Sequence, residues 1–542
     1  MPLRPPSQVM RLVRMGSCFA TRLSFMRVLV RELMQGGWRI DRPRFDLDPY
    51  GYGTAVYRVS RPDRAYSLVA FSQHLDPEQR TDRVIAEAWD ATFALFDGNP
   101  ADADIERLRQ NVPRQEAGRC LASELVLCRA NRSLRLFDHM AERLSQGCQP
   151  DEALVCDVGY LMRTTAVYGN GKFGLADRFH IAGRPELAGP FQAEMLAVYL
   201  VRLFTLDLVE HVAKARSPAT AVALAPHLKR FIGIGNATGL GMAPFLMTHP
   251  RLIANWMAAR EMALARSRAA ATLDGARLAA LLARARSHVA QWRVDDQRQM
   301  HRIVELDADL ARLSDHLDTL VTADAVYRWA EAHLGLEAQE LVVSLLIELY
   351  PERVDDLAHG MAAVETVSLD GAMRVGTMRD IIDGDYDWAL AVDTADPRQR
   401  SLFWYVSEEK LEPRLGNRHQ ETGAELERPF AVAHDIQAAR ADLEQAPADE
   451  SLAVFLMRHP EHRHVIRRAQ LVHCHPYGEI RDNLVAADCL PIDILRCKLA
   501  FFGAVKFDPK SDRWTRIAMY QGAPLPEDLS SPDADDWAFP CL

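Results

Sequence analysis

The sequence predicts a mainly α-helical protein with a small mixed β-sheet from segments near both termini, an α+β arrangement with a multi-helix core and one long heptad helix. Apolar residues recur at i, i+3 and i+4 over most of the chain between Thr81 and residue 365. A heptad pattern runs from Leu278 to Leu320, and runs of β-branched and aromatic residues flank turn residues near each end.

Length and composition limit the class of protein. The chain has 542 residues, 48% of them hydrophobic and 25% charged, which is typical of a folded chain of several domains. Its net charge of −10 argues against nucleic-acid and anionic-membrane partners. Nine cysteines without a CxxC pair favour a reducing compartment, and no apolar run is long enough to span a membrane. We therefore expect a cytoplasmic protein.

The first predicted elements are a helix and a hairpin. Residues 8–35 have helical spacing that ends at Gly36-Gly37. Arginines recur through this segment, so it has no uninterrupted apolar core of a secretory signal peptide, although its composition also fits an organellar presequence. Thr54–Ser60 and Ala65–Phe71 surround a turn, which predicts a β-hairpin. Helical spacing then predicts a series of helices over residues 82–97, 101–110, 116–147, 151–166 and 190–214.

The heptad segment is the most regular pattern in the chain. Thirteen positions from Leu278 to Leu320 are spaced by four and three, and eleven of them are apolar. Asp296 and Gln299 interrupt the seam in its middle. The seam must pack on another helix, either in an antiparallel hairpin within the chain or in a coiled coil between two chains, and we expect a homodimer or larger assembly because the stripe is otherwise exposed.

In the last third of the chain, helical spacing gives way to shorter strand-like and helical segments. Helical spacing continues to about residue 365 with Val342–Leu349 buried, and Trp388–Val392, Ser401–Ser407 and Leu471–His475 then resemble strands. Helices are expected at 434–444 and 451–458, and Ala500–Phe507 with Arg513–Tyr520 should form a second hairpin. These patterns divide the chain into residues 1–80 (helix plus hairpin), 81–250 (helical with Gly-rich loops), 251–365 (long helix) and 366–542 (α+β).

The densest polar cluster follows Arg163. Three glycines within residues 169–174 allow a ligand to approach the backbone, and anion-holding and proton-transfer groups surround them. The predicted catalytic residues are Tyr168, Lys172, Arg178 and His180, with Asn170 binding substrate. Lys172 is one of only seven lysines among 64 basic residues, a bias that indicates a GC-rich, bacterial genome. The alternative is a solvated loop between helices.

A second candidate is the glycine-rich segment 233–241. Its G-xxx-G-x-G spacing resembles the dinucleotide loop of short-chain dehydrogenases, but Pro244 follows at once and no second strand with a terminal acidic residue appears. The alternatives are a turn that lines a pocket and simple tight packing. We expect Gly235, Asn236, Thr238 and Gly239 to bind substrate and to face the same cavity as the 168–180 loop.

A third candidate is His473, His475 and Glu479. If these residues lie on a strand, both imidazoles can reach one metal, and the HxHxxxE spacing resembles the first cupin motif. Arg467 and Ala486 replace the flanking glycines of that motif, and no histidine follows residue 475. The favoured alternative is a hydrogen-bonded polar edge, and metal-free acid–base chemistry is the other. His459, His462 and His464 add to the cluster as a solvated surface or as one that responds to pH or collects metal.

The leading functional hypothesis is a cytoplasmic enzyme that acts on a small anionic organic molecule, a carboxylate or a phosphate. The alternatives are a helical interaction or scaffold protein and a metal-dependent enzyme that uses the HxHxxxE site. The motifs assign neither a reaction class nor a cofactor.

Overall fold

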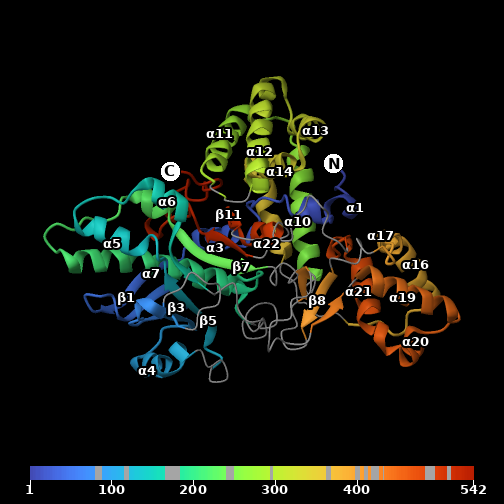
Figure 1. Ribbon diagram of the computed structural model, residues 1–542, viewed down its shortest axis with the longest axis horizontal. Coiled ribbons are helices and arrows are strands. Elements are labelled where there is room, and N and C mark those ends of the chain that lie inside the picture. Colours follow the sequence, from blue (N-terminus) through green and yellow to red (C-terminus); the bar gives the residue numbers. More distant parts are fainter. Residues whose placement is uncertain are drawn as a thin grey trace.

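The computed structural model divides into three parts that are arranged around the centre of the molecule (Figure 1). A sheet with its covering helices lies at the left, a group of helices stands at the top, and a second helical group lies at the right. The structure describes residues 1–79, 88–114, 121–164, 183–239, 250–292, 294, 297–361, 368–396, 403–407, 413–416, 427–430, 432–482, 495–509 and 514–542.

A nine-stranded sheet in the order β1-β2-β3-β4-β5-β6-β7-β12-β11 organises the left part. Every neighbouring pair is antiparallel except β6–β7, which is parallel. The strands are β1 (Arg39–Leu47), β2 (Gly53–Arg61), β3 (Arg64–Ser72), β4 (Ala91–Asp97), β5 (Glu124–Arg132), β6 (Tyr160–Thr164), β7 (Gly233–Gly239), β11 (Lys506–Pro509) and β12 (Trp514–Met519).

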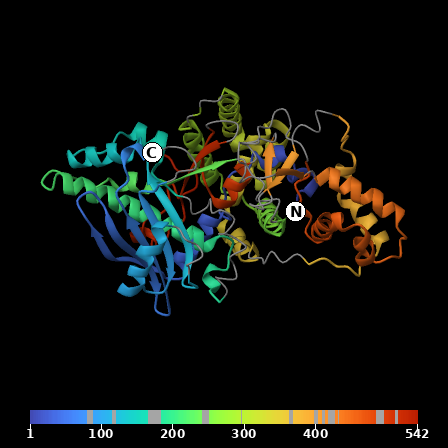
Figure 2. The same ribbon diagram turned by 60° about the horizontal axis from the view of Figure 1, so that its bottom comes forward.

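Helices cover both faces of this sheet. The 25-residue helix α7 (Gln192–Arg216) runs across one face, where Phe204 packs edge-on against Phe93 and Tyr57 (Figure 2). On the opposite face, Leu127 belongs to a smaller core with α4 (Asp102–Asn111). Short helices lie at the sheet margins: α5 (Phe137–Ser145), α6 (Glu152–Val158), α8 (Pro226–Phe231) and α22 (Leu495–Phe502).

The upper group of helices surrounds α14 (Leu336–Leu349), which is buried along most of its length. The burial expected for Val342–Leu349 is confirmed. Around α14 lie α10 (Pro250–Arg268), α11 (Gly275–Ala290), α12 (Gln297–His316), α13 (Ala323–His333) and α15 (Pro351–Val354).

The heptad segment is not one long helix. It forms α11 and α12, which end and begin on either side of the polar interruption at Asp296 and contact each other as well as α14. Seam residues from both helices are buried within the chain: Leu278, Leu282, Ala285, Val289, Leu306, Leu310 and Leu313. A second copy of the chain is therefore not required to cover them.

The right-hand group combines short helices with a three-stranded antiparallel sheet in the order β10-β8-β9. The strands are β8 (Phe403–Ser407), β9 (Pro413–Gly416) and β10 (Glu427–Phe430), and the helices are α16 (Val375–Asp385), α17 (Asp387–Leu390), α19 (Val432–Gln445), α20 (Leu452–Arg458), η9 (Pro460–His462) and α21 (Arg463–Cys474). Trp388–Val392 and Leu471–His475, both expected as strands, lie in α17 and in the end of α21 and its cap, because tertiary packing outweighs the β-propensity of short apolar runs.

The predicted fold class is therefore wrong in two respects. The sheet is large and takes strands from the middle of the chain as well as from both ends, and the single heptad helix is absent. Segments with apparent helical spacing form β4, β5 and β6, since short buried apolar runs satisfy helix and strand templates alike. The first predicted hairpin is confirmed as β2–β3, and the second is shorter than expected, as β11–β12. Within the described residues, no helix is long and apolar enough to cross a membrane.

The basic N-terminal segment is built into the core. It forms α1 (Pro6–Val9), α2 (Leu12–Met15) and α3 (Phe25–Gln35), and Arg4 places its guanidinium between Glu261 and Glu340, 2.7 Å from an oxygen of each. Arg14 and Arg260 also contact Glu340, both at 2.5 Å. Burial by itself would raise the pKa of Glu340, but the three arginines outweigh it and hold that pKa well below its usual range.

We expect Glu340→Gln to lower the free energy of unfolding by about 3–5 kcal/mol, because it leaves buried arginines without their counter-charge. Since the folded pKa is lowered, the stabilisation is complete above the unfolded pKa and is lost as pH falls below about 4.5. Chemical denaturation at pH 7 and at lower pH should show the difference between wild type and variant shrinking with acid. Glu352→Gln, at an exposed position on α15, is the control. An equal effect of both substitutions would contradict a special role for Glu340.

Candidate functional site

The glycine-rich candidate segment forms a strand, β7, that pairs in parallel with β6, the strand that precedes the other candidate segment in the sequence. Tyr160 of β6 is paired with Gly233 of β7, and Arg163 is paired with Gly235. The segment 165–182 follows β6 directly, and β7 is itself the glycine-rich candidate. Because the two strands are parallel, the end of β6 lies beside the middle of β7, and both strands run toward the same edge of the sheet. Ligands of open α/β sheets commonly bind at such an edge.

Five of the predicted site residues belong to the segment after β6. They lie outside the residues that the structure describes: Tyr168, Asn170, Lys172, Arg178 and His180. Their roles stay predictions from the sequence, as does the shared cavity expected for the two loops.

The other predicted binding residues lie in a strand and not in a turn. Gly235, Asn236, Thr238 and Gly239 belong to β7, which pairs with β6 on one side and with β12 on the other. Asn236 is buried. The glycines therefore do not form the strand-to-helix turn that the dehydrogenase resemblance implies.

Close packing accounts for two of these glycines. A Cβ at Gly235 would lie 2.5 Å from Cδ2 of Tyr160, and a Cβ at Gly233 would lie 2.3 Å from the carbonyl oxygen of Met519. Both distances are far below van der Waals contact. The tight-packing alternative thus explains why Gly233 and Gly235 lack side chains.

Three arginines flank β7 on one face of the sheet. Arg163 is paired with Asn131 of β5, so Arg129, two residues earlier in β5, points to the same side. Arg516 of β12 is paired with Ala237, two residues after Gly235, so it also leaves the sheet on that side. Leu127 continues the row of β5 side chains and packs on the α4 side. The three guanidinium groups therefore project from the face opposite α7.

The environment of these arginines differs in degree of burial. Arg163 is nearly buried, at 8% exposed. Arg129 is partly buried, which lowers its pKa, and its guanidinium carbon lies 4.7 Å above the ring of Trp89. The fully buried Asp90 joins the start of β4 to the end of β5: its carboxylate accepts the Arg132 N–H, and its own N–H donates to Asn131. Sequence reasoning missed this cationic face because it depends on which strands become neighbours.

The HxHxxxE residues do not converge. Glu479 is buried and accepts hydrogen bonds from Arg468 at 2.5 and 2.7 Å and from Tyr386 at 3.0 Å. His473, exposed on α21, bonds Asp385 through Nδ1 at 2.8 Å, and His475 caps the same helix. The strand geometry that would aim both imidazoles at one metal is absent, so the polar-edge alternative describes these residues.

Cys18 and Cys497 form a buried, hydrogen-bonded thiol pair beside a small cavity. Cys18 lines this cavity of about 40 Å³ with His288, Glu348 and Arg496, which is space for about three water molecules. A hydrogen bond from Cys497 is the main cause that lowers the pKa of Cys18, against burial, which raises it. Carbonyl oxygens lie near both ring nitrogens of His288, at 2.6 and 3.0 Å. The residues come from distant segments, so their proximity leaves no local sequence signal.

Comparisons with protein-family models, with curated proteins and with solved structures found no match for this chain.

We expect Gly235→Ala to lower the free energy of unfolding by about 1–3 kcal/mol, because the new methyl group overlaps the Tyr160 ring. Tyr160→Leu should reduce that penalty when the two substitutions are combined, which denaturation of the four proteins of the cycle can measure. Gly275→Ala is the control, since no atom lies within 4 Å of the Cβ that it would add. An additive cycle would show that the ring contact is not the constraint on Gly235.

Proposed function

We propose that the chain is an enzyme that acts on a small anionic organic molecule, a carboxylate or a phosphate, at the carboxyl edge of β6 and β7. The observation that carries the proposal is the parallel pairing of these two strands. Tyr168, Lys172, Arg178 and His180 follow β6 in the sequence, and β6 lies beside the strand that holds Gly235, about seventy residues further along the chain.

The charge of the sheet face supports an anionic ligand. Arg129, Arg163 and Arg516 are three guanidinium groups on one side of the sheet. Guanidinium groups bind carboxylates and phosphates through paired hydrogen bonds. In the proposed site these arginines hold the anion, Lys172 and Arg178 add charge, and Tyr168 or His180 transfers the proton.

The scaffold alternative has lost the feature that favoured it. That hypothesis rested on an apolar heptad stripe in need of a partner, and α14 covers this stripe from within the chain. We also propose a reducing compartment such as the cytoplasm, because Cys18 and Cys497 are hydrogen-bonded as free thiols.

We expect malonate or inorganic phosphate to raise the melting temperature of the wild-type protein, because a ligand that binds only the folded state stabilises it. Arg516→Met should abolish this increase with little effect on the melting temperature without ligand, since its side chain is only partly buried. Thermal unfolding followed by fluorescence, over a series of ligand concentrations at constant ionic strength, measures both effects.

Arg58→Met is the matched control for this experiment. Arg58 lies on β2, far along the sheet from β7, and pairs with Asp41 at its own edge. The variant should respond to both anions as wild type does. The proposal fails if neither anion raises the melting temperature of wild type, or if Arg516→Met retains the full increase.

We expect Lys172→Met to weaken malonate binding by about 10–100-fold, the loss of one charge-assisted hydrogen bond of about 1.5–3 kcal/mol. Titration calorimetry gives the dissociation constants, and Lys214→Met, an exposed lysine on α7, is the control. Equal affinities of Lys172→Met and wild type would remove Lys172 from the site while leaving the arginine face intact.

A further inference from the structure

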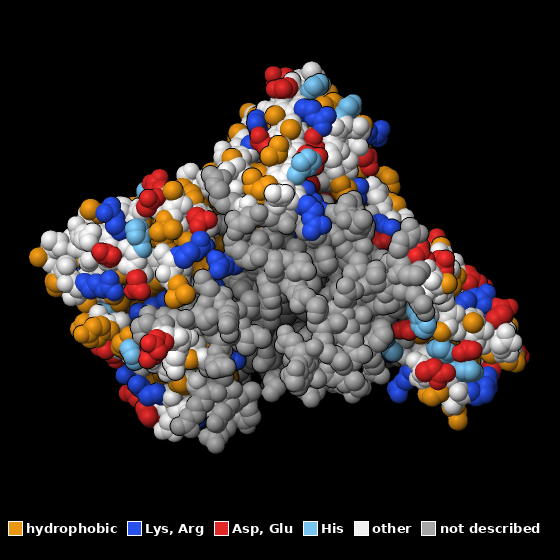
Figure 3. Space-filling view, viewed as in Figure 1, with side chains coloured by type: hydrophobic (Ala, Val, Ile, Leu, Met, Phe, Trp, Pro, Cys, Tyr) orange, Lys and Arg blue, Asp and Glu red, His pale blue; other side chains and the backbone are white. Residues whose placement is uncertain are grey.

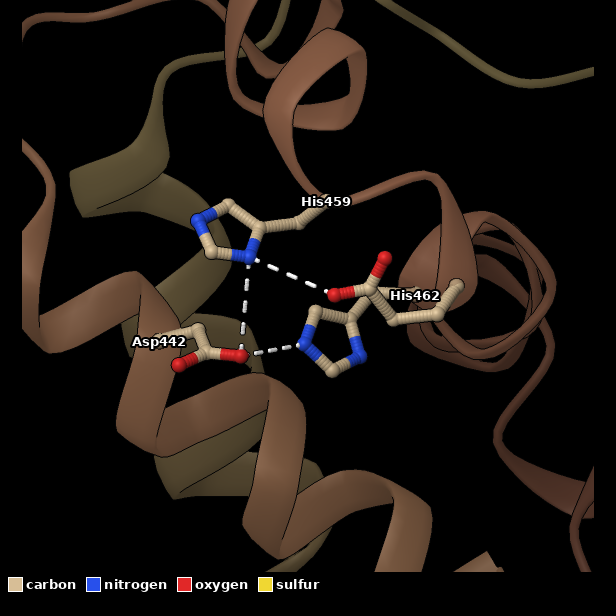
Figure 4. Close-up of side chains that lie close together, drawn as sticks. Asp442, His459 and His462 are labelled. Atoms are coloured by element: carbon tan, nitrogen blue, oxygen red, sulfur yellow. Dashed lines mark hydrogen bonds and ion pairs between the residues drawn. The ribbon is translucent and has the colours of Figure 1, made fainter.

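Four side chains that can ligate a metal meet in the right-hand helical group (Figure 4). Asp442 comes from α19, His459 follows the end of α20, and Glu461 and His462 belong to η9. One ligand atom from each of the four residues lies within 4.8 Å of the others. Among the described residues, no other group of His, Cys, Asp and Glu side chains meets this condition. On the lobe at the lower right in Figure 3, histidine and acidic side chains occur together.

The local sequence explains why both histidines face Asp442. Pro460 cannot continue α20, because it has no N–H to donate, and it begins a single 3₁₀ turn instead. Residues i and i+3 of such a turn lie above one another, which places His459 and His462 on the same side. The Phe455 ring stacks on His459 at 4.8 Å between centroids and is nearly parallel to the ring of His462. Both imidazoles are thereby held in position.

The distances between ligand atoms are close to those of a tetrahedral site. Zinc ligands at about 2.0–2.1 Å from the metal in tetrahedral geometry lie about 3.3 Å from one another. Here Nδ1 of His459 lies 3.4 Å from Oε1 of Glu461 and 3.6 Å from Oδ2 of Asp442. Nε2 of His462 lies 2.7 Å from the same Asp442 oxygen. A metal between these atoms requires this last pair to separate by about 0.6 Å, the difference from the tetrahedral spacing. The remaining pairs of ligand atoms lie within 4.8 Å of one another, so they need to approach by at most about 1.5 Å.

We propose that Asp442, His459, Glu461 and His462 bind a zinc ion. Imidazole nitrogen and carboxylate oxygen are both ordinary zinc ligands, and two neutral histidines with two carboxylates neutralise the charge of the ion. Four protein ligands leave no open position for a substrate, which marks a structural and not a catalytic zinc. The site is separate from the sheet edge that we propose for anion binding.

The bound ion would join α19 to the corner between α20 and α21. In the described residues, one hydrogen bond, from His462, joins this corner to Asp442. The side chain of His462 is 8% exposed and that of Glu461 is 58% exposed, so the site would lie at the surface with one buried ligand. Zinc would replace that bond by four ligand bonds. Because a proton and a zinc ion compete for the same histidine nitrogen, zinc affinity should decrease in acid.

The test uses full-length protein without a histidine tag, treated with a chelator and then titrated with zinc or cobalt(II). We expect one equivalent of zinc to bind and to raise the melting temperature, and cobalt(II) to give the visible absorption of a tetrahedral site. Asp442→Asn and Glu461→Gln should each weaken zinc at least about 10–100-fold, the loss known for outer-shell partners alone. Glu461 is exposed, so its substitution leaves folding intact.

His473→Gln is the matched control, because His473 is an exposed histidine of α21 that bonds Asp385 outside the cluster. It should bind zinc as wild type does. The proposal is overturned if wild type binds less than one equivalent, if cobalt(II) shows only octahedral absorption, or if Asp442→Asn and Glu461→Gln retain wild-type affinity. The last result would mean that zinc binds elsewhere on the surface and that His462 and Asp442 form an ordinary hydrogen bond.

Discussion

The structure depends on two buried glutamates of α14, a helix that is apolar along most of its length. Glu340 and Glu348 lie on α14 about 12 Å apart along its axis, and each binds arginines of the N-terminal segment. A carboxylate cannot remain charged in such a place without partners, so these pairs fix where the first residues of the chain lie. Arg22 and Arg27 also contact Asp535, so the same network holds the C-terminal tail. The arginines that make the N-terminus look like a targeting sequence are thus part of the core.

Sequence patterns predicted individual helices and hairpins better than they predicted which elements pack together. The β2–β3 hairpin could be predicted because its turn and its alternation are contiguous, and α7 because its helical spacing continues through 25 residues. Ala91–Asp97 could not, because a short apolar run fits a helix as well as a strand until its neighbours β3 and β5 are known. The heptad pattern misled for a related reason: its 4–3 spacing continues without a break from Leu278 to Leu320, although α11 ends at Ala290 and a separate helix, α12, begins at Gln297.

The same distinction applies to the candidate sites. The glycines of 233–241 were predicted to form a loop. In the structure, glycine is required at 233 and 235 because Met519 and Tyr160 of the neighbouring strands approach too closely for a side chain. The arginine face could not be predicted, since Arg129, Arg163 and Arg516 become neighbours only through the order β5-β6-β7-β12. The histidine cluster was visible in the sequence, but the residues of its most regular spacing, HxHxxxE, do not converge in the structure. A proline-initiated turn placed His459 and His462 together, and the carboxylate that completes the pair came from α19.

The chain segment that connects β6 to β7 links the stability of the sheet to its proposed function. Parallel neighbours cannot be joined by a tight turn, so the chain must cross the sheet between β6 and β7. The principal described element in that crossover is α7, about 37 Å long, whose apolar residues cover one face of the sheet from β2 to β7. The helix that buries this face is therefore also what makes β6 and β7 parallel and brings their carboxyl ends to one edge. A change that shortened α7 would therefore remove core contacts and the shared edge together.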